Sequence, residues 1–430
     1  MTSTPSPAAL MNHRARSDRA SLDPGGPLFL LTVGVLFAVP GGLLWELGLN
    51  YDGITGSIMS KIHPSSYLAA VNVVIVMALK PSSASPCRRL LEKYGGSVLL
   101  FTFTIAALGF AAISRRPGLA GLVDTFCVPA LLAITVEEVS EATRRRGEYL
   151  LHCILTCNAI LTIYEAVTNH HIFPYRYEGQ IPVELRPAGL QNHALSNAVV
   201  IGTYITILAY GAPLRLRTGV RATFIVLQLA ALILTGGRAA TVIISCFLLL
   251  RGLQGCARVL AGRRFSRAEA ALHLTVIPLV LLLVVVLVHQ GVFGILLDRF
   301  NEDSGSAMTR AKMFRMFTYI PFEQIMLGPD LQTVDYVRRR EGLELGIENP
   351  VVRFILYQGA VVTMMMIVGV ACFLVQIARS TGHIHVAPLI YFLAVISTFE
   401  SIGTKGSLLA KYAVMTAVLT NLRPIMYGRR

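Results

Sequence analysis

The chain has 430 residues, of which 54% are hydrophobic and only 14% are charged, with a mean hydropathy of +0.61. Apolar runs of about 17 residues or more recur along it, which excludes an ordinary water-soluble domain and predicts an all-α, polytopic membrane protein. The formal charge of +14 lies mostly in basic connections between apolar runs. Such a pattern indicates membrane topology and contact with anionic lipid headgroups rather than nucleic-acid binding.

The polar segment 1–26 is expected to be a disordered tail. Three arginines, Arg14, Arg16 and Arg19, precede the first apolar run. That run is too long for a signal peptide and is followed by no small-residue cleavage site, so it predicts a retained first helix with the tail in the cytoplasm.

About twelve membrane-spanning helices are predicted from the apolar runs. They cover residues 28–48, 60–79, 97–113, 118–136, 149–168, 195–212, 219–235, 238–252, 271–293, 350–377, 384–402 and 405–422. Nine spans therefore fall within 27–293 and three within 350–422. Arginines and lysines then gather on the inner connections, and the tail 423–430 joins the N-terminus in the cytoplasm.

Four acids, Glu46, Asp124, Glu165 and Glu400, lie in or near the predicted spans, where carboxylates often mark ion or proton pathways. Only Asp124 is expected deep in a span. A transporter or flippase that depends on Asp124 remains an alternative, although no inverted repeat accompanies it.

The first long outer connection, 169–194, ends in Arg186-Pro187-Ala188-Gly189-Leu190-Gln191-Asn192-His193. This density of arginine, amide and imidazole groups at the start of a span indicates a binding site. A plain turn shaped by Pro187 and Gly189, with Asn192 as a helix cap, explains the same residues equally well.

A short polar run, Thr235-Gly236-Gly237-Arg238, separates two apolar stretches that together are too long for one span. The chain is therefore expected to turn at the glycines. The turn would present the Arg238 guanidinium, a planar donor fork suited to phosphate or carboxylate, at the mouth of the bundle. An arginine that anchors the membrane interface is the alternative.

The second long outer connection, 294–349, is polar enough to form a small, partly helical subdomain, and we expect function to concentrate there. Within it Met313, Met316, Phe317 and Ile320 share one helical face, and Pro321 ends the pattern. This pattern predicts an amphipathic helix on the outer membrane surface, either as a structural cover or as a guide for substrate.

On this topology Arg186, Arg238, Arg299 and Arg310 all face the outer side and together could line a cationic cavity. With no P-loop and no convincing metal spacing, such a cavity favours a phosphate-bearing lipid. Guanidinium groups can stabilise a departing diphosphate without a metal. Glu348 is the acid best placed to act as a base on an incoming hydroxyl, unless it is an ordinary acid at a helix N-terminus.

In this order the polar patches resemble the superfamily of O-antigen ligases and Wzy-type polysaccharide polymerases. Arg186-Pro187-Ala188-Gly189 with Asn192 is similar to its first motif, and Thr235 to Ala239 to its second. The segments similar to its third motif are Arg299-Phe300, Arg310, Leu327-Gly328-Pro329-Asp330 and Glu348-Asn349. The resemblance covers residues 185 to 360.

Two positions depart from that family: Pro329-Asp330 stands where a glycine is usual, and Glu348 stands where a histidine is usual. The resemblance implies a GT-C-like helical fold and a metal-independent glycosyltransferase with no cofactor. It implies transfer of a growing glycan from undecaprenyl diphosphate to a lipid-linked repeat unit at the periplasmic face of the bacterial inner membrane. Chain-length regulators and export proteins are its expected partners, and transfer to lipid A core is the alternative within the family.

In that reaction Arg186, Arg238 and Arg310 are expected to hold the diphosphate, and Glu348 to orient or deprotonate the acceptor hydroxyl. Arg299, Asn192 and Asn349 are further candidates for substrate binding.

Overall fold

A computed structural model describes residues 23, 25–53, 56–79, 86–176, 180–181, 186–210, 216–262, 285, 312–343, 347, 349–381, 386–398 and 405–420. Every element in these ranges is helical. The longer helices are α2 (Gly26–Ala38), α4 (Pro64–Leu79), α5 (Pro86–Ile113), α7 (Val128–Glu138), α8 (Glu141–Thr168), α9 (Ala194–Tyr210), α10 (Thr218–Leu234), α11 (Arg238–Leu260), α16 (Leu331–Arg340), α18 (Ala360–Thr381), α19 (Val386–Ile396) and α20 (Leu408–Leu419). The shorter ones are α3 (Gly41–Glu46), α6 (Leu119–Leu122), α15 (Phe322–Leu327), α17 (Pro350–Gln358), a π-helical turn (Val123–Cys127) and 3-10 turns at Met59–Lys61 and Met316–Tyr319.

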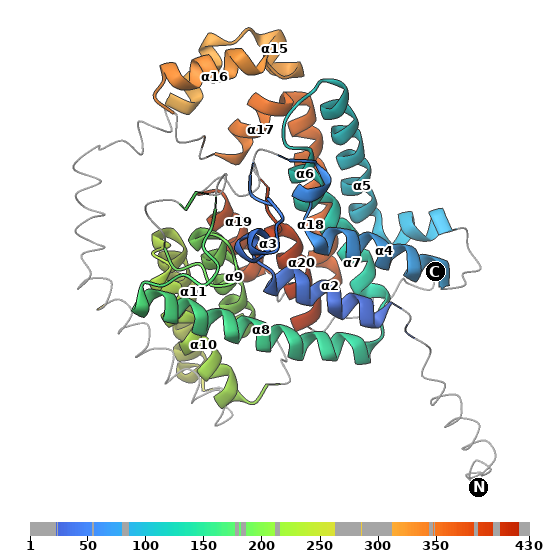
Figure 1. Cartoon of the computed structure of the whole chain (residues 1–430). Helices are drawn as coiled ribbons and strands as arrows, with labels where there is room; N and C mark the ends of the chain where they lie inside the picture. The colour runs from blue at the N-terminus through green and yellow to red at the C-terminus, as the bar shows by residue number, and fades with distance from the viewer. Residues whose placement is uncertain are drawn as a thin grey trace, which may run out of the picture.

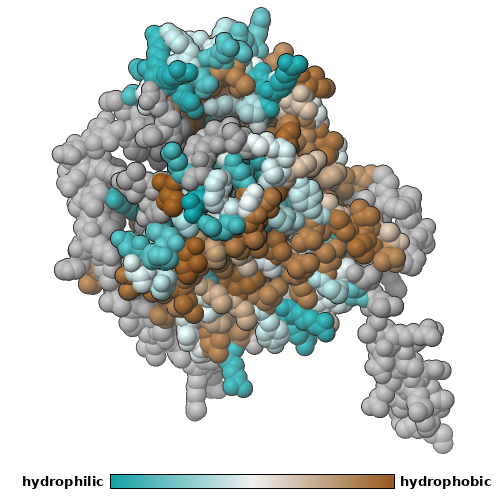
Figure 2. Space-filling view, in the orientation of Figure 1, coloured by the Kyte–Doolittle hydropathy of each residue, from teal (hydrophilic) through white to brown (hydrophobic). Residues whose placement is uncertain are grey.

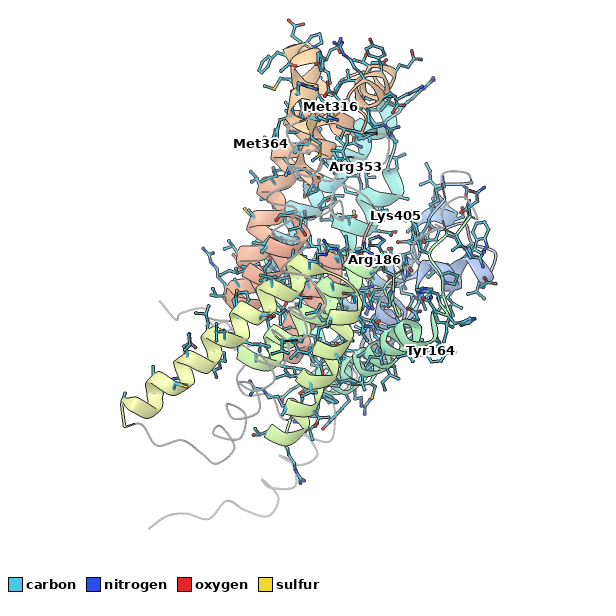
Figure 3. The ribbon with its side chains drawn as sticks, turned by 90° about the vertical axis from the view of Figure 1, so that its left-hand side faces the viewer. Tyr164, Arg186, Met316, Arg353, Met364 and Lys405 are labelled. Atoms are coloured by element: carbon cyan, nitrogen blue, oxygen red, sulfur yellow. The ribbon has the colours of Figure 1, made fainter. Side chains whose placement is uncertain are left out.

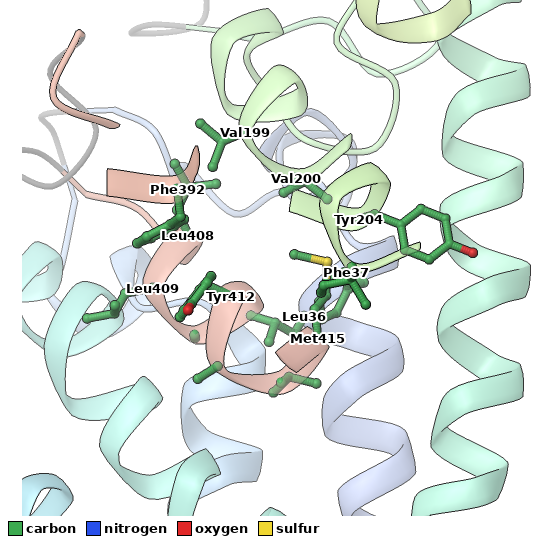
Figure 4. Close-up of a cluster of buried hydrophobic side chains, with 14 of the residues drawn as sticks. Leu36, Phe37, Val199, Val200, Tyr204, Phe392, Leu408, Leu409, Tyr412 and Met415 are labelled. Carbon is green, nitrogen blue, oxygen red and sulfur yellow. The ribbon is translucent and has the colours of Figure 1, made fainter. Parts of the chain in front are cut away.

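Helices α9 and α20 form the centre of the bundle, and every residue of α20 is buried. Side chains from four helices interlock there (Figure 4), and the rings of Phe392 and Tyr412 stack with centroids 4.5 Å apart. An interior of this kind is held together by close packing of large apolar and aromatic side chains. The figure also shows that α2 and α19 contribute to the cluster, through Phe37 and Phe392.

Five helical segments are long and apolar enough to cross a membrane: Leu91–Ile113, Leu119–Glu138, Glu141–Thr168, Arg238–Arg258 and Ala360–Thr381. Six further apolar helices of 10–17 residues coincide with other predicted spans. Hydrophobic side chains form a broad band across one face of the molecule, with hydrophilic side chains above it (Figure 2). The chain is therefore a helical, membrane-embedded protein. The predicted span 271–293 lies outside the described residues.

Two predicted spans are broken in the structure. The first is divided into α2 and α3 by the extended residues Val39 and Pro40. The tenth is divided into α17 and α18 at Gly359, whose φ of +90° ends α17 because the left-handed region favours glycine. The second part of each predicted span is thus a helix of its own, α3 in the first span and α18 in the tenth.

The part of the second long connection that the structure describes has its own hydrophobic core. Met313, Met316, Val334, Val337 and Leu356 are among its buried members. Helices α15, α16 and α17 lie together at the top of the molecule (Figure 1). The predicted amphipathic face of Met313, Met316 and Ile320 is buried in this core instead of lying on the membrane surface, because α16 and α17 cover it. We call the described residues within 312–358 (312–343, 347 and 349–358) the outer subdomain.

The outer subdomain docks on the bundle through a close approach of two glycine backbones. A Cβ on Gly359 would lie 2.6 Å from the Gly328 nitrogen and 2.8 Å from the Met326 oxygen. The Arg116 guanidinium, between α5 and α6, donates to the carbonyl oxygens of Gly328 and Pro329. The Gly328-Pro329 segment therefore has a structural role as the docking point of the subdomain.

The opposite end of the bundle is joined by other polar contacts. The Asp23 carboxylate accepts hydrogen bonds from the Ser140 nitrogen at 2.7 Å and the Thr143 hydroxyl at 2.7 Å. Lys93 forms an ion pair with Glu138 at 2.9 Å. These contacts join the start of α2 to α8, and α5 to the last residue of α7, at the end that the basic connections predict to be cytoplasmic.

Candidate functional site

The run from Thr235 to Arg238 turns the chain as its glycines predict. Helix α10 ends at Leu234, Gly236 has a φ of +68°, and α11 begins at Arg238. The Thr235 hydroxyl donates to the Leu232 carbonyl at 2.6 Å and accepts from the Gly237 nitrogen at 3.3 Å, so the turn is braced internally. The Arg238 side chain is exposed at the start of α11.

The connection that precedes α9 is held from beneath by polar side chains of α8. The buried Glu165 carboxylate accepts from the Ala188 and Gly189 nitrogens, both at 2.9 Å. The Asn158 side-chain oxygen accepts from the Leu190 nitrogen at 2.8 Å. Gly189 has a φ of +54°, and a Cβ there would lie 2.7 Å from both the Asn158 oxygen and the Thr162 hydroxyl. The loop conformation seen here therefore requires glycine at position 189, because a Cβ would collide with side chains of α8.

These two segments meet at Arg186. The Arg186 Cδ lies 3.6 Å from the position of a Cβ on Gly236, so its side chain runs along the turn that leads to Arg238. Neither guanidinium group makes an ion pair or a hydrogen bond with any residue in the described ranges. Two exposed, uncompensated guanidinium groups therefore stand beside one turn.

The Arg186 charge also acts on its own loop. Burial lowers the pKa of His193, and the nearby Arg186 charge lowers it further. The His193 ring packs edge-on to Tyr175 with centroids 6.4 Å apart. His193 is thus a neutral imidazole beside the arginines at neutral pH, and it does not compete with them for an anion.

The two asparagines predicted to bind substrate are engaged within the fold. The Asn192 side-chain oxygen accepts from the Gly41 nitrogen at the start of α3, and Asn192 has a φ of +63°. The Asn349 side-chain oxygen caps α17 by accepting from the Val351 and Val352 nitrogens at 2.9 and 3.1 Å. Asn349 therefore has the role of a helix cap. Arg299, Arg310 and Glu348 lie outside the described residues.

Next to Asn192 lies a cluster of buried polar groups centred on Asp124, in the π-helical turn. Its carboxylate accepts from the Ser66 hydroxyl at 2.6 Å, the Tyr51 hydroxyl at 3.1 Å and the His63 nitrogen at 3.1 Å. Asp124 is 1% exposed, as its deep position in a predicted span suggested. The three donors satisfy the carboxylate, so Asp124 joins the connection 47–63 to the bundle.

Lys405 completes this cluster from the connection before α20. Its ammonium donates to the Tyr51 carbonyl and lies 3.2 Å from the centroid of the Tyr51 ring, a cation–π contact. Burial lowers the pKa of Lys405 to about 8, although the charges of Asp124 and Asp52 raise it. Burial raises the pKa of Asp52 to about 6, against the opposing effect of Lys405.

A second lysine, Lys411, is buried in α20 and donates to the Gln191 side-chain oxygen at 2.6 Å. It ties the Arg186 loop to the central helix from below. Sequence reasoning missed Lys405, Lys411 and Asp52. Lys411 carried a usable signal, since it is an ionisable residue within a predicted apolar span.

Figure 3 shows how the site lies relative to the outer subdomain. Arg353 on α17, Lys405 and Arg186 follow one below another beneath Met316 of the subdomain core. Among the described residues, no group of three or more His, Cys, Asp or Glu side chains is arranged to hold a metal ion. Guanidinium and ammonium groups of the kind gathered here can bind an anion, and carboxylates can exchange a proton.

Comparison with known proteins identifies no relative of this chain. No protein-family model, no curated protein and no solved structure matches the chain.

Proposed function

We propose that this protein is a polysaccharide polymerase of the bacterial inner membrane. It transfers a growing glycan from undecaprenyl diphosphate to a lipid-linked repeat unit at the periplasmic face, with both termini in the cytoplasm. The observation that carries the proposal is the meeting of Arg186 with the turn before Arg238, two exposed guanidinium groups without an acidic partner in the described ranges. The ordered similarity to O-antigen ligases and Wzy-type polymerases supports the same activity.

In this proposal the two guanidinium groups bind the diphosphate of the donor. As the bond between the anomeric carbon and the diphosphate oxygen breaks, negative charge develops on that oxygen, and the arginine forks stabilise it. The bonds from Glu165 and Asn158 fix the main chain of the loop that carries Arg186, which lowers the backbone reorganisation needed in the reaction. Arg310 is proposed to assist at the diphosphate, and Glu348 to orient or deprotonate the acceptor. Arg299 remains a proposed substrate contact.

A carrier mechanism has weaker support. The proton-coupled alternative depends on Asp124, whose carboxylate is saturated by hydrogen bonds from Ser66, Tyr51 and His63. Arg186 and Arg238, by contrast, are exposed and have no acidic partner among the described residues. We therefore place the chemistry at the arginine turn.

Deletion of the gene tests the proposed reaction in the cell. We expect single lipid-linked repeat units to accumulate on undecaprenyl diphosphate and long polymer to be lost. Polymer of full length on the carrier, without transfer to an acceptor, would instead identify a ligase. Normal polymer in the deletion strain would reject both.

The substitution Arg238→Lys tests the arginine fork itself. Lysine keeps the charge but loses the bidentate geometry, so polymer formation should fall by about 10²-fold while the amount of protein in the membrane is unchanged. The matched control is Arg217→Lys, an exposed arginine at the other end of α10, which should leave polymer unchanged. Equal activity of both variants would show that Arg238 is only a structural arginine.

A further inference from the structure

Asp52 differs from Asp124 and Glu165, two buried carboxylates of the bundle, in having no hydrogen-bond donor among the described residues. Asp124 and Glu165 each accept from the main chain or from hydroxyl groups. Asp52 accepts no hydrogen bond from the part of the chain that the structure describes, and it is mostly buried but still partly exposed. A carboxylate that is neither saturated nor fully solvated is the kind of group that takes up a proton in catalysis.

The position of Asp52 links it to the arginine turn. A side chain on Gly41 would collide with both the Asp52 carboxylate and the Asn192 amide, so these two groups lie against the same point of α3. Asn192 ends the loop that begins at Arg186. Asp52 therefore stands at the far end of the loop whose first residue is proposed to bind the diphosphate.

Lys405 is close enough for its charge to act on Asp52, and its ammonium group contacts the neighbouring Tyr51 through the Tyr51 carbonyl and ring. No ion pair within 4.0 Å joins Lys405 to Asp52 in the described ranges, although the two charges influence each other. The positive charge of Lys405 thus favours the ionised form of the Asp52 carboxylate, although the two groups form no ion pair. Such an arrangement keeps a carboxylate ionised and still available for a proton.

We propose that Asp52 is the general base of the transfer reaction, which rests on the polymerase function proposed above. Its carboxylate accepts the proton of the acceptor hydroxyl as that oxygen forms a bond to the anomeric carbon of the donor glycan. The bond from the anomeric carbon to oxygen breaks at the same time, and undecaprenyl diphosphate leaves with the electron pair. Asp52 then releases its proton to water.

The charged and titratable groups around Asp52 set the expected pH dependence. They are Lys405 before α20, Asp124 in the π-helical turn and, in its own connection, Tyr51, whose ring packs against His63. Because burial raises the pKa of Asp52 to about 6, the base is protonated and inactive below that pH. Turnover should rise as the pH passes through about 6 and then level off.

The test uses the full-length protein in lipid nanodiscs, with lipid-linked repeat units isolated from the deletion strain as substrate. Asp52→Asn should lower kcat by about 10²-fold and leave KM for the lipid-linked substrate unchanged, since the arginine turn is intact. Asp52→Glu should retain activity and move the acidic limb of the pH profile. The control Glu141→Gln, at an exposed position on the first turn of α8, should behave as the wild type.

The outcomes separate this inference from the function on which it rests. If the wild type forms no longer glycan, the polymerase function fails. A second outcome is that the wild type elongates the substrate while Asp52→Asn has the same kcat and the same acidic limb of the pH profile as the wild type. That result rejects Asp52 as the general base and leaves the polymerase function standing. A kcat loss in Glu348→Gln but not in Asp52→Asn assigns the base to Glu348. An unshifted limb in Asp52→Glu also overturns the proposal, even if Asp52→Asn does not fold.

Discussion

At the scale of single residues, buried polar groups determine where the exposed arginines stand. Glu165 and Asn158 bind the main chain of the Arg186 loop, and Lys411 binds Gln191 below it. Burying these groups is favourable only because each finds a partner. The sequence placed Glu165 near an outer helix end but could not reveal its partners, because they come from a different segment whose distance depends on the fold.

The glycine at the centre of that loop provides a direct test of its geometry. Gly189→Ala should disorder the loop, because a Cβ would lie 2.7 Å from Asn158 and Thr162 atoms at a φ of +54°. We expect a lower melting temperature in detergent and about 10-fold less polymer or worse. Gly48→Ala is the matched control, since its φ is +82° but nothing lies within 4 Å of the added Cβ. Equal effects of the two substitutions would mean that backbone strain alone, and not the contact with α8, matters.

At the scale of elements, apolar periodicity predicted the helices well but not their breaks. The runs 28–48 and 350–377 are continuous in hydropathy, whereas the structure divides them at Val39-Pro40 and at Gly359. The face of Met313, Met316 and Ile320 was correctly identified as one apolar surface, yet its assignment to the membrane was wrong. Periodicity shows that a face is buried and cannot distinguish lipid from a second protein core.

The docking of the outer subdomain is tested by Gly359→Ala. The added methyl group would collide with backbone atoms of Leu327 and Gly328, which cannot move independently of their helix. We expect segment 312–343 to become sensitive to protease in nanodiscs while the bundle stays folded. In the control variant, Gly109→Ala in α5, nothing lies within 4 Å of the new Cβ and the protease pattern should be that of the wild type. Unchanged protection in Gly359→Ala would contradict the docking described here.

At the scale of the whole molecule, the distribution of arginines anticipated which connections share an end. Predicted outer connections meet one another, or the outer ends of predicted spans, through Arg186 and Gly236, Asn192 and Gly41, Lys405 and Tyr51, and Arg116 and Gly328. The excess of arginine and lysine on inner connections could predict this arrangement, because it depends on which side of the membrane a connection lies and not on how the helices pack. The charged centre of Asp52, Asp124 and Lys405 was not predictable as a unit, because its members are separated by long stretches of sequence.

Labelling of single cysteines tests the direction of the bundle in the membrane. In a background without the natural cysteines, Gln332→Cys on the exposed face of α16 should react in intact spheroplasts with a maleimide that does not cross membranes. Arg145→Cys, whose native side chain is 52% exposed at the other end of the bundle, should react only after permeabilisation. The opposite labelling pattern would place the arginine turn in the cytoplasm and reject a periplasmic reaction.

The central claim, that the arginine turn binds and releases a glycan diphosphate, is tested most directly with purified protein. Lipid-linked repeat units from the deletion strain are incubated with the protein in nanodiscs, and the products are resolved by mass. The account predicts a ladder of longer lipid-linked glycans with one undecaprenyl diphosphate released for each bond formed, and its loss in Arg186→Lys and Arg238→Lys. Substrate that stays unchanged with folded wild-type protein, or a ladder that both variants make as well as the wild type, would contradict it.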